Sequence, residues 1–100
     1  MTMRFAVGDP LPLRWPAKDP DELLDYSIDW TARLDGDTLS SVEWIVPSEL
    51  TEDHTGQSGA VATIWLGGGT LGIQHTVTCR VTTAAGRIMD QSALIKIITR

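Results

Sequence analysis

The sequence lacks the features that several classes of protein require. It has a single cysteine, Cys79, so no disulfide bond can form within the chain and nothing indicates an oxidising compartment. No run approaches the ~20 apolar residues of a membrane span, and the first eight residues lack the apolar stretch of a signal peptide. With 8 lysines and arginines against 13 acids, the net charge is −5, and no basic stripe could neutralise nucleic-acid phosphates. We therefore expect a protein that is made and folded in the cytoplasm and that binds neither membranes nor nucleic acid.

The charges that are present are unevenly placed along the chain. Residues 1–53 hold twelve acids and four bases, whereas residues 54–100 hold one acid and four bases. Such a separation could favour head-to-tail contacts between copies of the chain. The alternative is that the acids simply keep a β-rich protein soluble.

Apolar and polar residues alternate with a period of two over residues 25–34, which predicts a long, half-buried strand with Trp30 as its largest inward side chain. A turn over residues 35–38 leads into a second strand, residues 39–46, which Pro47 ends. Residues 48–59 are polar and are expected to form a connection, with at most a short edge pairing near Leu50.

Three more strands are expected over residues 60–66, 73–82 and 88–99. Trp65 points outward if Ala62, Ile64 and Leu66 point inward; the opposite register would bury it, and the pattern leaves both open. In the last strand we expect Ala93, Ile95 and Ile97 inward, and Gln91, Leu94 and Lys96 outward. The expected core comprises Tyr26, Ile28, Trp30, Leu34, Val42, Trp44, Val46, Val77, Cys79 and Val81.

Six to seven strands at spacings of ten to twelve residues predict one all-β domain over residues 23–100. The expected architecture is an immunoglobulin- or fibronectin III-like antiparallel β-sandwich. One hundred residues leave no room for a second core.

Residues 1–22 hold four of the five prolines and are expected to form an extended N-terminal arm. One interpretation is an irregular first strand that covers the domain's own core. The other is an arm that reaches a neighbouring subunit. In the second case the interface residues would be Phe5, Leu11, Leu13 and Trp15, together with an outward Trp65 on the sandwich.

No constellation of residues indicates catalysis, a cofactor or a metal ion. The glycine-rich loop 67–72 lacks the lysine of a phosphate-binding loop. His75 and Cys79 are separated by roughly 13 Å along one strand, too far for a nucleophile–base pair. We expect Cys79 to be a core residue and His75 to be structural, with its polar tip bonded to nearby backbone. His54, beside Glu52 and Asp53, shows no calcium-site spacing.

Four stretches, residues 15–22, 24–30, 65–70 and 76–87, together resemble small proteins of tailed bacteriophages and prophages that are known as fiber–tail adaptors. The resemblance covers residues 14–98, and one departure is His75 where tyrosine is expected. It implies a non-enzymatic virion structural protein of the tail. This protein would join the tail or portal-proximal assembly to the fibers in several copies, as a homo-oligomer or a ring component. The alternative from the residues alone is a carbohydrate- or ligand-binding sandwich module, with Trp65 or Trp15 as a stacking platform.

Overall fold

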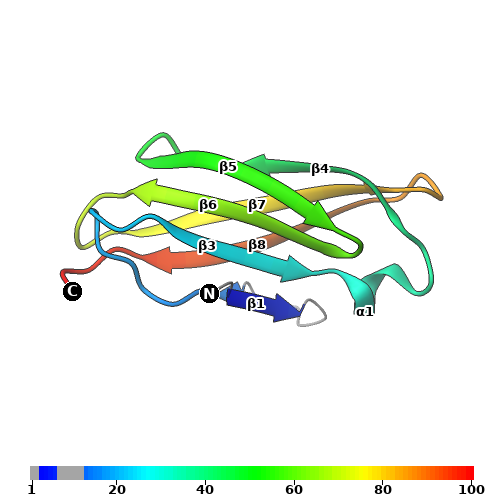
Figure 1. Ribbon diagram of the computed structural model, residues 1–100, viewed down its shortest axis with the longest axis horizontal. Helices are drawn as coiled ribbons and strands as arrows, with labels where there is room; N and C mark the ends of the chain where they lie inside the picture. Colours follow the sequence, from blue (N-terminus) through cyan, green and yellow to red (C-terminus); the bar gives the residue numbers. More distant parts are fainter. Residues whose placement is uncertain (1–2, 7–12) are drawn as a thin grey trace.

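The computed structural model describes the backbone of residues 3–6 and all atoms of residues 13–100. The described residues form eight strands and one short helix (Figure 1). Their bounds are β1 Met3–Ala6, β2 Leu13–Arg14, β3 Leu24–Asp29, α1 Thr31–Leu34, β4 Leu39–Ile45, β5 Leu50–Ser58, β6 Val61–Gly68, β7 Gln74–Thr83 and β8 Ile88–Lys96. No helix in this part of the chain is long and apolar enough to cross a membrane.

The strands make two four-stranded sheets that pack face to face. Sheet A has the order β1-β3-β6-β5, and sheet B has the order β2-β8-β7-β4. Neighbouring strands run antiparallel, except that β1 pairs with β3 and β2 pairs with β8 in parallel. β5 and β4 lie along one long side of the sandwich and β1 along the other (Figure 1). The structure is therefore an all-β sandwich, as the sequence predicts.

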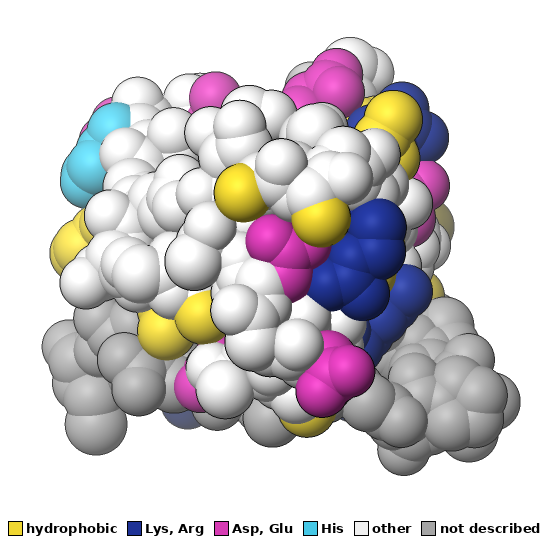
Figure 2. All heavy atoms as spheres, turned by 90° about the vertical axis from the view of Figure 1, so that its right-hand side faces the viewer, with side chains coloured by type: hydrophobic (Ala, Val, Ile, Leu, Met, Phe, Trp, Pro, Cys, Tyr) yellow, Lys and Arg dark blue, Asp and Glu magenta, His cyan; other side chains and the backbone are white. Residues whose placement is uncertain are grey.

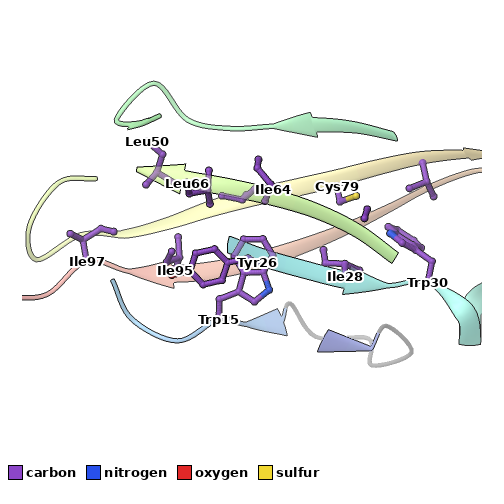
Figure 3. Close-up of a cluster of buried hydrophobic side chains, with 14 of the residues drawn as sticks. Trp15, Tyr26, Ile28, Trp30, Leu50, Ile64, Leu66, Cys79, Ile95 and Ile97 are labelled. Carbon is purple, nitrogen blue, oxygen red and sulfur yellow. The ribbon is translucent and has the colours of Figure 1, made fainter. Parts of the chain in front are cut away.

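The core lies between the sheets and is made of inward side chains from both (Figure 3). Seven of the ten expected core residues are buried, namely Tyr26, Ile28, Trp30, Leu34, Val77, Cys79 and Val81. The other three, Val42, Trp44 and Val46, lie on or just after the edge strand β4 and are half-buried against this cluster. An edge strand has a neighbour on one side only, so its inward side chains stay partly exposed.

The strand expected over residues 25–34 ends at Asp29, and one helical turn follows. The Asp29 carboxylate accepts hydrogen bonds from the backbone N–H of Thr31 (3.0 Å) and from its hydroxyl (2.6 Å). Such local bonds compete with the sheet ladder and turn the chain into α1. Asp35 then adopts a left-handed conformation (φ +48°) that ends the helix. Leu34 is still buried, but it reaches the core from a helix and not from a strand.

Two further expectations are wrong in detail. Residues 50–58 form a nine-residue strand, β5, and not a polar connection. Hydrophobic alternation is absent there because neither face of β5 is buried beyond Leu50.

Gln91, expected to point outward, points inward, since it shares its strand face with Ala93. It is 7% exposed, and its side-chain amide donates a hydrogen bond to the carbonyl of Ser92 (3.0 Å).

Residues 13–18, expected in the arm, pack onto the domain's own sheets. The backbone N–H of Trp15 donates to the carbonyl of Leu94, and that of Lys18 donates to the carbonyl of Lys96. Trp15 is 5% exposed and is a core residue, which corrects its assignment as an interface residue; Leu13 is half-buried against the same core. The backbone of Phe5 lies in β1, whereas its side chain and all of Leu11 lie outside the described residues.

Candidate protein-interaction surfaces

Three large apolar side chains are exposed at the end of the sandwich that carries the C-terminus and the β6–β7 loop (Figure 1). They are Leu23, Leu71 and Ile73, with exposed fractions of 47%, 56% and 47%. We call them the loop-end residues. Exposed apolar side chains gathered in one region are typical of contact sites with other proteins.

The loop that carries Leu71 and Ile73 is held in place by backbone hydrogen bonds. The N–H of Gly72 donates to the carbonyl of Ile97 (2.8 Å), and the N–H of Ile97 donates to the carbonyl of Ile73 (3.0 Å). The N–H of Thr70 donates to His75 Nε2 (3.1 Å), and His75 is 6% exposed. His75 thus bonds to nearby backbone, as expected for a structural residue. The loop that carries Leu71 and Ile73 is therefore bonded to neighbouring backbone at several points.

Lys18 hydrogen-bonds to backbone carbonyls at the end of the sandwich that carries the loop-end residues. The sequence does not indicate this role. Its side chain is fully buried, and its Nζ donates to the carbonyls of Asp19 (2.7 Å) and Gly68 (2.6 Å). Burial lowers the pKa of Lys18, while the carboxylates of Glu22, Asp19 and Asp21 act to raise it. A lysine beside an acidic turn is usually a solvated residue, so no pattern could have revealed this burial.

Trp65 lies on the outer face of sheet A. Ala62, Ile64 and Leu66 are fully buried, which fixes the register in which Trp65 points away from the core. The ring of His54, from the neighbouring β5, stacks on Trp65 with a centroid distance of 5.0 Å and an interplanar angle of 20°. His54 Nδ1 is in turn 2.6 Å from a carboxylate oxygen of Asp53. Trp65 is half-buried, so part of its side chain is available at the surface.

β5 is a polar strand at the edge of sheet A. Every residue from Thr51 to Ser58 is exposed, and the strand pairs with β6 on one side only among the described strands. Its register against β6 shifts between Glu52 and His54. The free side of such a strand presents backbone N–H and C=O groups to a partner.

At the opposite end of the sandwich, Lys and Arg side chains gather toward one side of the face, and acidic side chains lie beside them (Figure 2). Arg87 Nη2 donates to Asp37 Oδ2 (3.1 Å) and to the carbonyl of Leu34 (2.6 Å). Hydrogen bonds from Thr83 and from the N–H of Thr38, together with Arg87, lower the pKa of Asp37 to about 2. A shallow pocket beside this ion pair is lined by Leu34, Asp37, Thr38, Leu39, Gln57, Gly59 and Ala60. Figure 2 shows hydrophobic side chains there only as separate spots.

Some charges that are separated along the sequence are neighbours in space. Asp37 from the acidic first half pairs with Arg87 from the second, and Glu22 lies 3.8 Å from Arg100. Each sheet also combines strands from both halves of the chain. The physical basis for a head-to-tail contact between acidic and basic ends is therefore weakened.

The described residues offer little reactive chemistry. Cys79 is fully buried, and burial raises the pKa of its thiol to about 12, which leaves almost no nucleophilic thiolate. Nowhere in residues 13–100 do three His, Cys, Asp or Glu side chains converge to hold a metal ion. Trp15 is enclosed in the core and cannot act as a platform for a sugar ring.

The structure thus defines an all-β sandwich whose exposed features are apolar side chains, an aromatic pair and an open sheet edge. It is similar to the crystal structure of the cysteine protease inhibitor EhICP2 from Entamoeba histolytica, with a TM-score of 0.56. The similarity covers 96% of this chain and 94% of that one at 9% sequence identity, which supports a common fold alone. No curated protein sequence is significantly similar to the chain.

The family is given by a sequence comparison. The model of the family "Podophage GP4 fiber-tail adaptor protein gp77" matches residues 18–96, and the chain belongs to this family. The resemblance seen in the sequence is confirmed. The family name implies a structural, non-enzymatic protein of the phage tail that acts between tail and fibers.

Proposed function

We propose that this protein joins the tail of a podophage to its fibers through protein–protein contacts, in several copies around the tail. The match to the adaptor family over residues 18–96 carries this proposal. A rigid sandwich suits the role, because contacts made at different ends of one core keep a fixed distance and orientation. The proposed location is the tail of the virion.

We further propose that the sandwich is of the immunoglobulin type. In that fold one sheet contains strands B, E and D side by side, and the other contains G, F and C. The orders β3-β6-β5 and β8-β7-β4 correspond to these two sets. His75 near the start of β7 occupies the region of the tyrosine corner and makes the same kind of bond to upstream backbone.

The loop-end residues are the proposed contact with one of the two partners. Burying exposed apolar surface releases roughly 25 cal/mol per Å², so a few such side chains can dominate a contact of modest size. Trp65 on the outer face of sheet A is proposed as a second contact residue. Phe5 and Leu11 are also proposed contact residues.

The test is binding of the purified protein to the tail and fiber proteins of the same phage, measured by surface plasmon resonance. The double variant Leu71→Asp/Ile73→Asp is expected to lose binding to one partner and to retain the other. Ile88→Asp is the matched control, because Ile88 is 69% exposed at the other end of the sandwich. Unchanged binding by the double variant would exclude the loop end as a contact. Failure of the wild-type chain to bind any tail or fiber protein would count against the adaptor function itself.

The alternative of a carbohydrate-binding module now rests on Trp65 alone, and His54 already stacks on one face of its ring. A glycan screen with the wild type and Trp65→Ala separates the two functions. Binding of a glycan that depends on Trp65, with no affinity for tail proteins, would favour the module.

A further inference from the structure

The two longest edge strands, β4 and β5, lie along the same side of the sandwich (Figure 1). Each has a register shift near its start and then five residues in regular pairing. These are Ser41–Ile45 in β4 and His54–Ser58 in β5. In the part of the chain that the structure describes, the other edge strands, β1 and β2, have only four and two residues. β4 and β5 are therefore the edges that are long enough to accept a further strand.

Pairing of an edge strand with the same strand of a second copy is governed by its central residue. In an antiparallel pair related by a two-fold axis, the central residue lies opposite itself. The centre of the regular segment in β4 is Glu43, so self-pairing would place two carboxylates face to face. The centre in β5 is Gly56, where an added Cβ would meet no atom within 4 Å beyond its chain neighbours. The sequence thus opposes self-pairing at β4 and permits it at β5.

The charges of β5 also favour the antiparallel arrangement. With Gly56 at the axis, Thr55 lies opposite Gln57 of the other copy, and His54 lies opposite Ser58. Glu52 and Asp53 precede this segment and would face the uncharged Gly59–Ala60 end of the other copy. A parallel pair would instead place Glu52 and Asp53 against the same acids, at a cost in free energy.

We propose that two copies of this protein associate through β5, antiparallel about an axis at Gly56, so that their two A sheets become one continuous sheet. The backbone groups on the free side of β5 supply the hydrogen bonds, as in other cases of strand addition. Because the axis is two-fold, the same contact serves both copies and closes on itself. This contact is independent of the loop-end residues and leaves them exposed for another partner.

Cross-linking at the axis tests the geometry directly. Opposite Cα atoms in antiparallel strands are about 4.5–5.5 Å apart, within the range of about 4.4–6.8 Å that a disulfide accepts. The variant Gly56→Cys is expected to form a covalent dimer on mild oxidation. Gln74→Cys, exposed on sheet B, is the control and is expected to stay monomeric. Cys79 is buried and does not compete. An equal yield of dimer from both variants would overturn the proposal.

Self-association measured by sedimentation velocity gives a second test. The wild type is expected to dimerise with concentration, and Gly56→Asp is expected to weaken the dimer by at least about tenfold because it opposes two carboxylates. Gln74→Glu should leave the dimer unchanged, and circular dichroism checks that each variant folds. A wild type that stays monomeric up to about 1 mM would overturn the proposal. The proposal would also be overturned if the wild type is monomeric and Gly56→Asp loses binding to a fiber or tail protein. In that case the free edge of β5 would bind that protein and not a second copy of the chain.

Discussion

The indole of Trp15 lies parallel to the ring of Tyr26, with centroids 4.7 Å apart and planes inclined by 15°. Tyr26 belongs to β3 in sheet A and donates a hydrogen bond from its hydroxyl to the carbonyl of Pro16 (3.3 Å). The backbone of Trp15 bonds to Leu94 in β8 of sheet B. Trp15 therefore connects residues 13–18 to both sheets.

The first prediction separates the two tryptophans that the sequence grouped together as contact residues. Trp15→Ala should lower the free energy of unfolding by about 3–5 kcal/mol, because it removes a large buried side chain. Trp65→Ala, on the outer face, should cost about 1 kcal/mol or less. Urea unfolding at pH 7 measures both. Similar losses in the two variants would contradict the burial of Trp15.

The second prediction concerns Gly69 in the β6–β7 loop. Its φ is +107°, and an added Cβ would lie 2.6 Å from Ile97 Cδ1, so Gly69→Ala should cost about 2–5 kcal/mol from backbone strain and overpacking together. Gly72 also has a positive φ (+83°), but it has open space around it. Gly72→Ala is thus the matched control, with backbone strain alone and a cost of about 1–2 kcal/mol. Equal costs from thermal or urea unfolding would show that Ile97 moves aside.

The sandwich could be predicted from the sequence because β4, β6, β7 and β8 each have one face that is more buried than the other. Alternation of apolar and polar residues reports that difference directly, so the sequence predicts β4, β6, β7 and β8 close to the positions that they occupy in the structure. β5 has no such difference, since all its residues after Leu50 are exposed, so it looked like a loop. A strand defined by backbone pairing alone leaves no mark in hydrophobic periodicity.

The candidate contact surfaces were less predictable, because they depend on distant parts of the chain. Trp15 and Trp65 look alike in sequence, and only the pairing of residues 13–18 with β8 decides which of them is enclosed. Leu23 and Leu71 come to the same end through the fold and share no local pattern. The buried ammonium group of Lys18 is hydrogen-bonded to the carbonyl of its neighbour Asp19 and to that of Gly68, at the end of β6 and far away in the sequence.

The third prediction concerns stability in acid. The pKa of Asp37 is about 2 in the folded chain, below its ordinary value of 3.8. The ionised form therefore stabilises the fold at pH values above about 4, and this contribution is lost as the pH falls from about 4 to about 2. Asp37→Asn should be less stable than the wild type at pH 6, and the difference should shrink toward pH 2.

Asp35→Asn is the control for that experiment, because Asp35 is an exposed neighbour outside the ion pair with Arg87. It changes the net charge by the same amount, and asparagine tolerates the left-handed backbone found there. Urea unfolding of the three proteins between pH 6 and pH 2 gives the comparison. A difference between Asp37→Asn and the wild type that does not vary with pH would exclude the carboxylate as its cause.

The last prediction uses Cys79 as a reporter of the core. Its thiol is fully buried and its pKa is raised to about 12, so both access and thiolate content are low in the folded state. Labelling by a thiol reagent at pH 8 should be slower by roughly a hundredfold or more than for the exposed cysteine of the Gln74→Cys variant. Labelling should become fast in guanidinium chloride.

Because Cys79 packs in the same core cluster as Trp30 and Trp15, its slow labelling measures how often that cluster opens. Trp15→Ala should therefore accelerate labelling, whereas Trp65→Ala should not, and rapid labelling of the wild type would mean that the sandwich opens at β7 without global unfolding.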